Sequence, residues 1–170
     1  MTYFKHTANT RGVLWIMAVA LAVGVSCHGS DSDTTPAGGS LAQVEMGAPS
    51  GTVHSGDPFN IHIKGRNLGF SVFHSVRIHV TLTPPLVVDR VDVTGGTGTA
   101  TFSNNVGGGA TVDYLFPTID KVSQSTGTIH AHGSLGAGQS SVSANITAEM
   151  TSDEVHSGEA VASVTVVVQQ

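Results

Sequence analysis

Cysteine and charge are both scarce in this chain. A single cysteine, Cys27, stands among 170 residues, and charged residues make up only 11% of them. One cysteine cannot close an internal disulfide, so a small fold held together by disulfides is excluded. Seven lysines and arginines stand against twelve aspartates and glutamates. A chain with so little positive charge is a poor partner for nucleic acid and for anionic lipid headgroups.

Long apolar runs are also missing, with one short exception near the start. Residues 13–25 carry no charge, and only Gly24 among them is not apolar. A membrane-spanning helix needs roughly 20 such residues, so this run is too short to be one. The run follows a positively charged start with Lys5 and Arg11, and small residues close it. This pattern predicts a cleaved signal peptide over residues 1–26.

The run ends in Gly24-Val25-Ser26-Cys27, which resembles the lipobox of bacterial lipoproteins, a family that prefers leucine where Gly24 stands. The resemblance implies that Cys27 becomes the first mature residue and carries acyl lipid, with no other cofactor. Acylation gives a use to a thiol that would otherwise be free in an exported protein, and several acyl chains anchor a protein stably. We therefore expect a lipoprotein of the bacterial cell envelope. By resemblance to enteric sorting signals, His28 favours the outer membrane, with its periplasmic or surface side left open.

Past the cysteine, the composition changes twice. Residues 28–40 are rich in Gly, Ser, Thr and Pro and have no large apolar side chain, which predicts a flexible linker over residues 27–40 that begins with the lipidated cysteine. Residues 41–170 have the size of one domain. Removal of Lys5 and Arg11 leaves five basic and twelve acidic residues, a formal charge of 5 − 12 = −7.

Apolar residues after the linker alternate with polar ones, the period of strands with one buried face. No helical period follows Cys27, so the sequence predicts an all-β fold: a single Ig-like antiparallel β-sandwich of about seven to nine strands. The strongest alternation falls on 59–63, 76–82, 142–148 and 162–168, and weaker strands are expected over 43–48, 86–93, 111–116 and 126–131. The expected core comprises Phe59, Val76, Ile78, Tyr114, Phe116, Ile129, Ile146 and Val164.

The order of turns and strands carries a second resemblance. Ser55-Gly56-Asp57 precedes a strand, an Asn67-Leu68-Gly69 turn follows it, and later come the aromatic strand 112–116 and a closing Val/Thr strand. Together they resemble the Ig-like repeat of bacterial envelope proteins known as the eleventh domain of unknown function. This chain departs from the repeat at Pro84-Pro85, where Pro-Gly is usual, and at Val122, where glycine is usual. The resemblance implies a structural or adhesive module without chemistry.

Nine histidines raise the alternative of a metal site. His130 and His132 alternate on one expected strand, so their imidazoles share a face. His62 and His79 fall on the polar faces of their own strands and offer further candidate ligands. No acid is expected beside the pair. Asp89 and Asp92 lie too near each other in sequence for the carboxylate pair of a glycosidase and are interpreted as acids of a surface turn. Solvated surface histidines without a metal are therefore predicted, and a copper- or zinc-handling envelope protein stays open as the alternative.

No catalytic arrangement is visible in the sequence. No serine stands in a Gly-x-Ser-x-Gly elbow between a strand and a helix, and Gly95 to Gly98 lacks the lysine of a phosphate-binding loop. The prediction is a non-enzymatic, lipid-anchored envelope protein that acts as a structural, adhesive or binding module. Its partner is the membrane together with an unknown protein or glycan, and not nucleic acid. A cohesin-like or carbohydrate-binding module is a further alternative, since cohesins share the Gly-Asp and Asn-Leu-Gly features.

Overall fold

A computed structural model describes residues 41–49 and 51–170. The predicted signal peptide, Cys27 and the linker lie outside these described residues. Ten strands and no helix occur in this part of the chain, which confirms the all-β prediction. Accordingly, no helix within it is long and apolar enough to cross a membrane. The strands are β1 (Ala42–Gly47), β2 (Thr52–His54), β3 (Pro58–Asn67), β4 (Phe73–Leu82), β5 (Leu86–Gly95), β6 (Thr99–Asn104), β7 (Ala110–Ile119), β8 (Ser123–Gly133), β9 (Ser141–Thr151) and β10 (Val161–Gln169).

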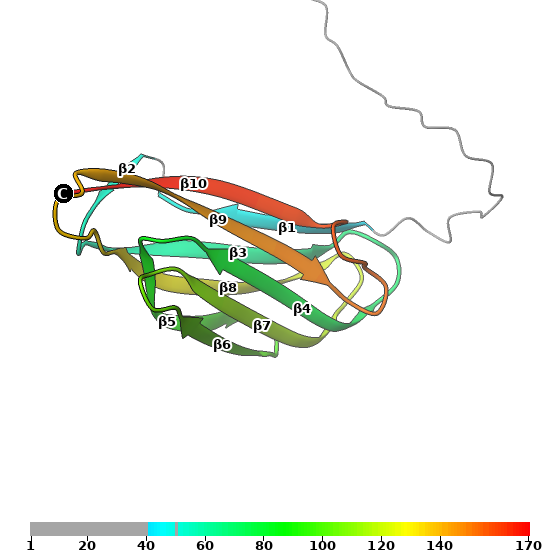
Figure 1. Ribbon diagram of the computed structural model, residues 1–170. Helices are drawn as coiled ribbons and strands as arrows, with labels where there is room; N and C mark the ends of the chain where they lie inside the picture. Colours follow the sequence, from blue (N-terminus) through cyan, green and yellow to red (C-terminus); the bar gives the residue numbers. More distant parts are fainter. Residues whose placement is uncertain (1–40, 50) are drawn as a thin grey trace, which may run out of the picture. The chain divides into compact units, whose positions relative to one another are not determined.

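The strands form two sheets that face each other as the layers of a sandwich (Figure 1). The four-stranded sheet has the order β1-β3-β8-β5, and the six-stranded sheet has the order β2-β10-β9-β4-β7-β6. Neighbouring strands are antiparallel throughout, except that β2 runs parallel to β10. The predicted antiparallel sandwich is therefore confirmed, with one short parallel pair at an edge.

Apolar and polar residues that alternate in the sequence are alternately buried and exposed in the strands. In β3 the side chains of Phe59, Ile61 and Ile63 are buried, while Asn60 and His62 between them are exposed. All eight expected strands are present. The two strands that were not predicted, β2 and β6, are the outermost strands of the six-stranded sheet. β2 has three residues and β6 is exposed along most of its length, so neither leaves an alternating apolar pattern in the sequence.

The core between the sheets contains seven of the eight residues expected there. Val164 is the exception, since it is only partly buried against the core. At some positions of the core, a glycine of one sheet lies against a large side chain of the other. Gly127 of the four-stranded sheet lies against the Tyr114 ring, and a Cβ atom added to it would stand 2.2 Å from Cε1 of that ring. A similar atom on Gly65 would stand 2.7 Å from Cδ1 of Ile78. Glycines of one sheet therefore make room for large side chains of the other.

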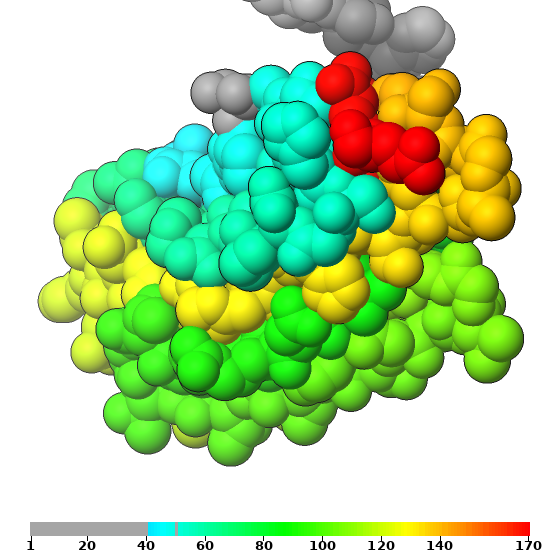
Figure 2. All heavy atoms as spheres, turned by 90° about the vertical axis from the view of Figure 1, so that its left-hand side faces the viewer, coloured from blue at the N-terminus to red at the C-terminus, as the bar shows by residue number. Residues whose placement is uncertain are grey.

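The loops gather at the two ends of the sandwich. The β3–β4, β7–β8 and β9–β10 loops lie at the end where β1 begins (Figure 1). Figure 2 views the other end, where the β2–β3, β4–β5, β6–β7 and β8–β9 loops gather around the C-terminus. A hollow of about 480 Å³ at that end is lined in part by Pro84, Gly108 and Leu135.

Candidate functional site

The outer face of the four-stranded sheet brings together three of the four predicted histidines. His62 lies on β3, and His130 and His132 lie on the adjacent strand β8. All three side chains occupy positions that alternate with buried residues and so point away from the core. In the register of the two strands, His130 stands opposite Asn60 and His62 stands opposite Thr128. The predicted sharing of one face by His130 and His132 is confirmed.

Strand β5 supplies an acid to each histidine of the pair. His132 Nδ1 lies 3.0 Å from both carboxylate oxygens of Asp89, and His130 Nε2 lies 2.9 Å from Oδ2 of Asp92. The expectation that no acid stands beside the pair is therefore wrong, as is the interpretation of both acids as turn residues. The cause is the pairing of β5 with β8, which joins residues about 40 positions apart in sequence and lies beyond any local pattern.

A β-bulge in β5 makes both contacts possible. The register of β5 against β8 shifts between Val88 and Arg90, so Asp89 is the extra residue. Such a residue is free of the ladder and can aim its side chain differently from the regular alternation. Asn104 of β6 holds the strand just before the bulge. Its side chain accepts a hydrogen bond from the Val88 N–H at 2.9 Å and donates one to the Val88 carbonyl at 2.8 Å.

Arg90 completes the cluster around His130. Its Nε donates to Oδ2 of Asp92 at 3.1 Å, and its Nη2 lies 3.0 Å from Nε2 of His130. One imidazole nitrogen cannot donate to Asp92 and accept from Arg90 at the same time. The tautomer and charge of His130 therefore decide which of the two contacts is made, and protonation of the ring favours the contact with Asp92.

The other edge of the same face carries a carboxylate between two cations. Glu45 of β1 lies 2.7 Å from Nη1 of Arg66 and 3.3 Å from Nζ of Lys64. The Arg66 guanidinium, followed by the Lys64 ammonium, lowers the pKa of Glu45 below its ordinary value. Between the two edges, His62 Nδ1 contacts the Thr128 hydroxyl at 3.2 Å. The face therefore has three basic and three acidic residues. Glu45 pairs with Lys64 and Arg66, Asp92 pairs with Arg90 and His130, and Asp89 pairs with His132.

His79, the fourth predicted candidate, lies on the other sheet. It belongs to β4, and its Nδ1 contacts Oδ1 of Asp113 at 2.8 Å, an oxygen that also accepts from Nε of Arg77 at 2.7 Å. The Arg77 contact lowers the pKa of Asp113 despite its partial burial. The four histidines therefore do not converge. Across residues 41–49 and 51–170, no group of three or more His, Cys, Asp and Glu side chains is placed to hold a metal ion.

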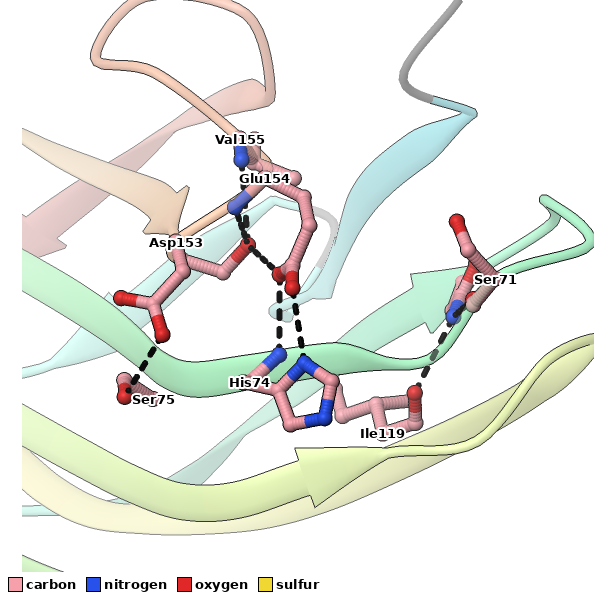
Figure 3. Close-up of polar contacts among 9 residues, drawn as sticks. Ser71, His74, Ser75, Ile119, Asp153, Glu154 and Val155 are labelled. Carbon is pink, nitrogen blue, oxygen red and sulfur yellow. Dashed lines mark hydrogen bonds and ion pairs between the residues drawn. The ribbon is translucent and has the colours of Figure 1, made fainter. Parts of the chain in front are cut away.

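A further polar cluster, which sequence patterns did not reveal, ties the β9–β10 loop to β4. His74 Nδ1 lies 2.8 Å from Oε1 of Glu154, and the Ser75 hydroxyl donates to Asp153 at 3.1 Å (Figure 3). Burial alone would raise the pKa of Glu154, but hydrogen bonds from the His74 ring and backbone N–H lower it overall. Because Ser75 bonds to Asp153 and His74 to Glu154, serine and histidine are not coupled as in a nucleophilic relay. The cluster fixes a loop.

Comparison with protein-family models gives no match for this chain. Comparison with curated proteins gives none either. Solved structures share the fold. A cohesin module from a family 33 glycoside hydrolase of Clostridium perfringens aligns with a TM-score of 0.54 and 9% identity, over 76% of this chain and 98% of that one. A type I cohesin–dockerin complex from Clostridium thermocellum aligns with a TM-score of 0.51 and 11% identity, over 84% of this chain and 99% of that one. At these identities the similarity concerns the fold alone.

Proposed function

We propose that this chain is a non-enzymatic, lipid-anchored protein of the bacterial cell envelope whose domain binds a protein partner through the outer face of the four-stranded sheet. The observation that carries the proposal is the gathering of charge on that face. Three of the five basic residues between positions 41 and 170 lie there, each in contact with an acid on the same face. The remaining surface has two basic residues, Arg77 and Lys121, and is strongly acidic.

An extended array of ion pairs suits recognition of a macromolecule better than chemistry on a small molecule. Charged groups arranged in a fixed pattern give an interface its specificity and speed its formation, because a partner with the complementary pattern is selected from others. Arg90 and Arg66 offer planar groups with several donors, a residue type enriched in protein interfaces. The fold supports this reading, since the Clostridium thermocellum cohesin of the same fold was solved bound to a dockerin.

The lipid anchor rests on residues 13–27, outside the part of the chain that the structure describes. A short apolar run that ends in Val25-Ser26-Cys27 supports acylation of this single cysteine. The domain would then work at a membrane surface, and His28 favours the outer membrane. A tether suits a binding module, because it holds the domain at high local concentration near partners in the same envelope.

Site-specific photo-cross-linking in intact cells tests the proposed face. A photoreactive residue replaces Asn60, which is exposed on the outer face of the four-stranded sheet, or Asn145, which is exposed on the outer face of the other sheet. The two positions are matched in residue type and exposure. A discrete cross-linked protein from position 60 and none from position 145 is expected. Equal products from both positions, or a product from position 145 only, would show that the face is wrongly assigned.

A further inference from the structure

At the end of the sandwich where β1 begins, the ends of β1, β3 and β8 share an unusual feature. Ala42, Asn67 and Ser123 stand side by side in the register of β1, β3 and β8. The next residue outward from each is a large apolar one: Leu41, Leu68 and Val122, with exposed fractions of 50%, 38% and 69%. Leu68 N–H donates to the Leu41 carbonyl at 2.8 Å, so these ends are held together.

Phe70 lies at the tip of the β3–β4 loop at the same end and is 88% exposed. Asn67, itself fully buried, holds this loop. Its Nδ2 donates to the carbonyls of Ser71 at 2.7 Å and Ile119 at 3.0 Å, and its Oδ1 accepts from the Gly69 N–H at 2.9 Å. Because an ordered loop with a satisfied buried amide presents Phe70, the exposure of this ring is a built-in feature of the loop.

Val122 is exposed at a conformational cost. Its φ is 52°, in the left-handed region that glycine adopts freely and that β-branched residues rarely adopt. The residue makes this strained turn while its side chain projects into solvent. Strained backbone at an exposed apolar position points to a use for the side chain, because a glycine would relieve the strain without loss of core packing.

Exposed apolar residues are unevenly distributed over the described part of the molecule. Of its eight large exposed hydrophobic residues, four form this group, which we name the apolar end: Leu41, Leu68, Phe70 and Val122. Only Val106, in the β6–β7 loop, belongs to the loops of the opposite end. Isolated exposed hydrophobic residues need no explanation, but a cluster of them marks a surface that contacts a partner or a membrane.

We propose that the apolar end docks on the lipid surface to which Cys27 is anchored, with Phe70 inserted at the headgroup boundary. The inference rests on the lipid anchor of the proposed function. Only thirteen residues, 28–40, separate Cys27 from Leu41, and a chain of this length and composition has a typical end-to-end distance of roughly 20 Å. An acylated Cys27 therefore keeps Leu41 close to the bilayer, and Leu41 belongs to the apolar end.

The charge of the domain indicates which kind of lipid surface it can dock on. Between positions 41 and 170 acidic residues outnumber basic ones by ten to five, so attraction to anionic headgroups does not contribute. Apolar insertion into a zwitterionic interface is left as the driving force. Docking in this way leaves the outer face of the four-stranded sheet, which lies along the strands and not at their ends, free for a protein partner.

A tryptophan reporter in the mature, lipidated protein tests docking. Trp15, the only tryptophan of the sequence, is removed with the signal peptide, so Phe70→Trp carries the single indole of the lipidated protein. The matched control is Phe102→Trp, at an exposed phenylalanine of edge strand β6. The proteins are reconstituted in phosphatidylcholine and phosphatidylethanolamine vesicles with or without lipids that bear a doxyl quencher at the headgroup boundary. Quenching of the Phe70→Trp indole about threefold stronger than that of the control is expected, with a blue-shifted emission.

Flotation of the same vesicles separates the possible results. If the protein floats with the vesicles but the two indoles are quenched equally, the docking proposal is wrong and the lipid anchor stands. A blue shift of the Phe70→Trp indole without quenching by lipid, growing with protein density, shows that a second copy covers the apolar end and also overturns the proposal. Protein that does not float disproves the lipid anchor, and docking with it.

Discussion

The two sheets of the sandwich differ on both of their faces. On the inside, the four-stranded sheet presents glycines where the six-stranded sheet presents large side chains, as Gly127 does to Tyr114. On the outside, the four-stranded sheet presents six charged residues, five of them in ion pairs with one another and the sixth, Asp89, paired with His132. The outer side of β9 and β10 instead presents mainly serine, threonine and asparagine, as in the contact of Thr165 with Asn145. The inner difference makes the sheets fit, and the outer difference gives the molecule one face suited to recognition.

The largest effect is expected from a substitution that disrupts the packing between the two sheets. Gly127→Ala places a Cβ atom 2.2 Å from the Tyr114 ring, which has no room to move in the core. Overpacking of this kind costs about 3 kcal/mol of unfolding free energy. The control is Gly47→Ala on the outer face, where the nearest atom to a new Cβ is 3.9 Å away and a change below about 0.5 kcal/mol is expected. Urea unfolding followed by circular dichroism measures both, and equal losses would contradict the proposed fit between the sheets.

Charge reversal compares the two outer faces as binding surfaces. Arg90→Glu disrupts the array on the four-stranded sheet, and Arg77→Glu removes an equivalent surface ion pair on the other sheet. The first should weaken binding to the cross-linked partner about tenfold or more, which is about 1.4 kcal/mol. The second should leave the affinity within about twofold. Titration calorimetry with the purified partner measures both affinities, and the reverse order would transfer recognition to the six-stranded sheet.

A smaller effect concerns the hydroxyl of Tyr114. It is a buried side-chain oxygen without a hydrogen-bond partner within the described residues, and burial together with the charge of Asp92 raises its pKa. Tyr114→Phe removes an unsatisfied polar group and keeps the ring that fills the space above Gly127. The variant should be more stable than the parent by about 1 kcal/mol. A loss of stability of that size would instead reveal a partner for the hydroxyl.

The smallest effect is the acid dependence of stability, which is compared at one paired carboxylate from each sheet. The pKa of Glu45 is lowered from its ordinary 4.5 and that of Asp113 from 3.8. A carboxylate with a lowered pKa stabilises the folded state above its ordinary pKa, and this stabilisation is lost as the pH falls through the folded-state value. Asp113→Asn should cost less than about 1 kcal/mol at neutral pH and nothing at low pH. Glu45→Gln should behave alike with a smaller loss, and unfolding curves between neutral pH and acid test both.

Local sequence patterns predict much of this architecture. The features that they do not predict were missed for identifiable physical reasons. Alternation alone locates strands such as β3 and β4, because one buried face forces a period of two. The same pattern predicts that the side chains of His62 and His79 point outward. It does not predict to which sheet each histidine belongs, because that depends on pairing between distant segments. The position of Asp89 beside His132 could not be predicted, because it depends on a β-bulge and bulges leave no clear periodic signal in the sequence. The apolar end also escapes, because its four residues lie in three separate segments of the chain.

Phase partitioning in detergent is a direct test of the lipid anchor at Cys27. The full chain is expressed in a bacterial envelope with or without globomycin, and in parallel as Cys27→Ala. The native protein should enter the detergent phase, while Cys27→Ala should move to the aqueous phase and globomycin should leave an unprocessed precursor. Recovery of the native, mature protein in the aqueous phase would contradict the anchor on which this account depends.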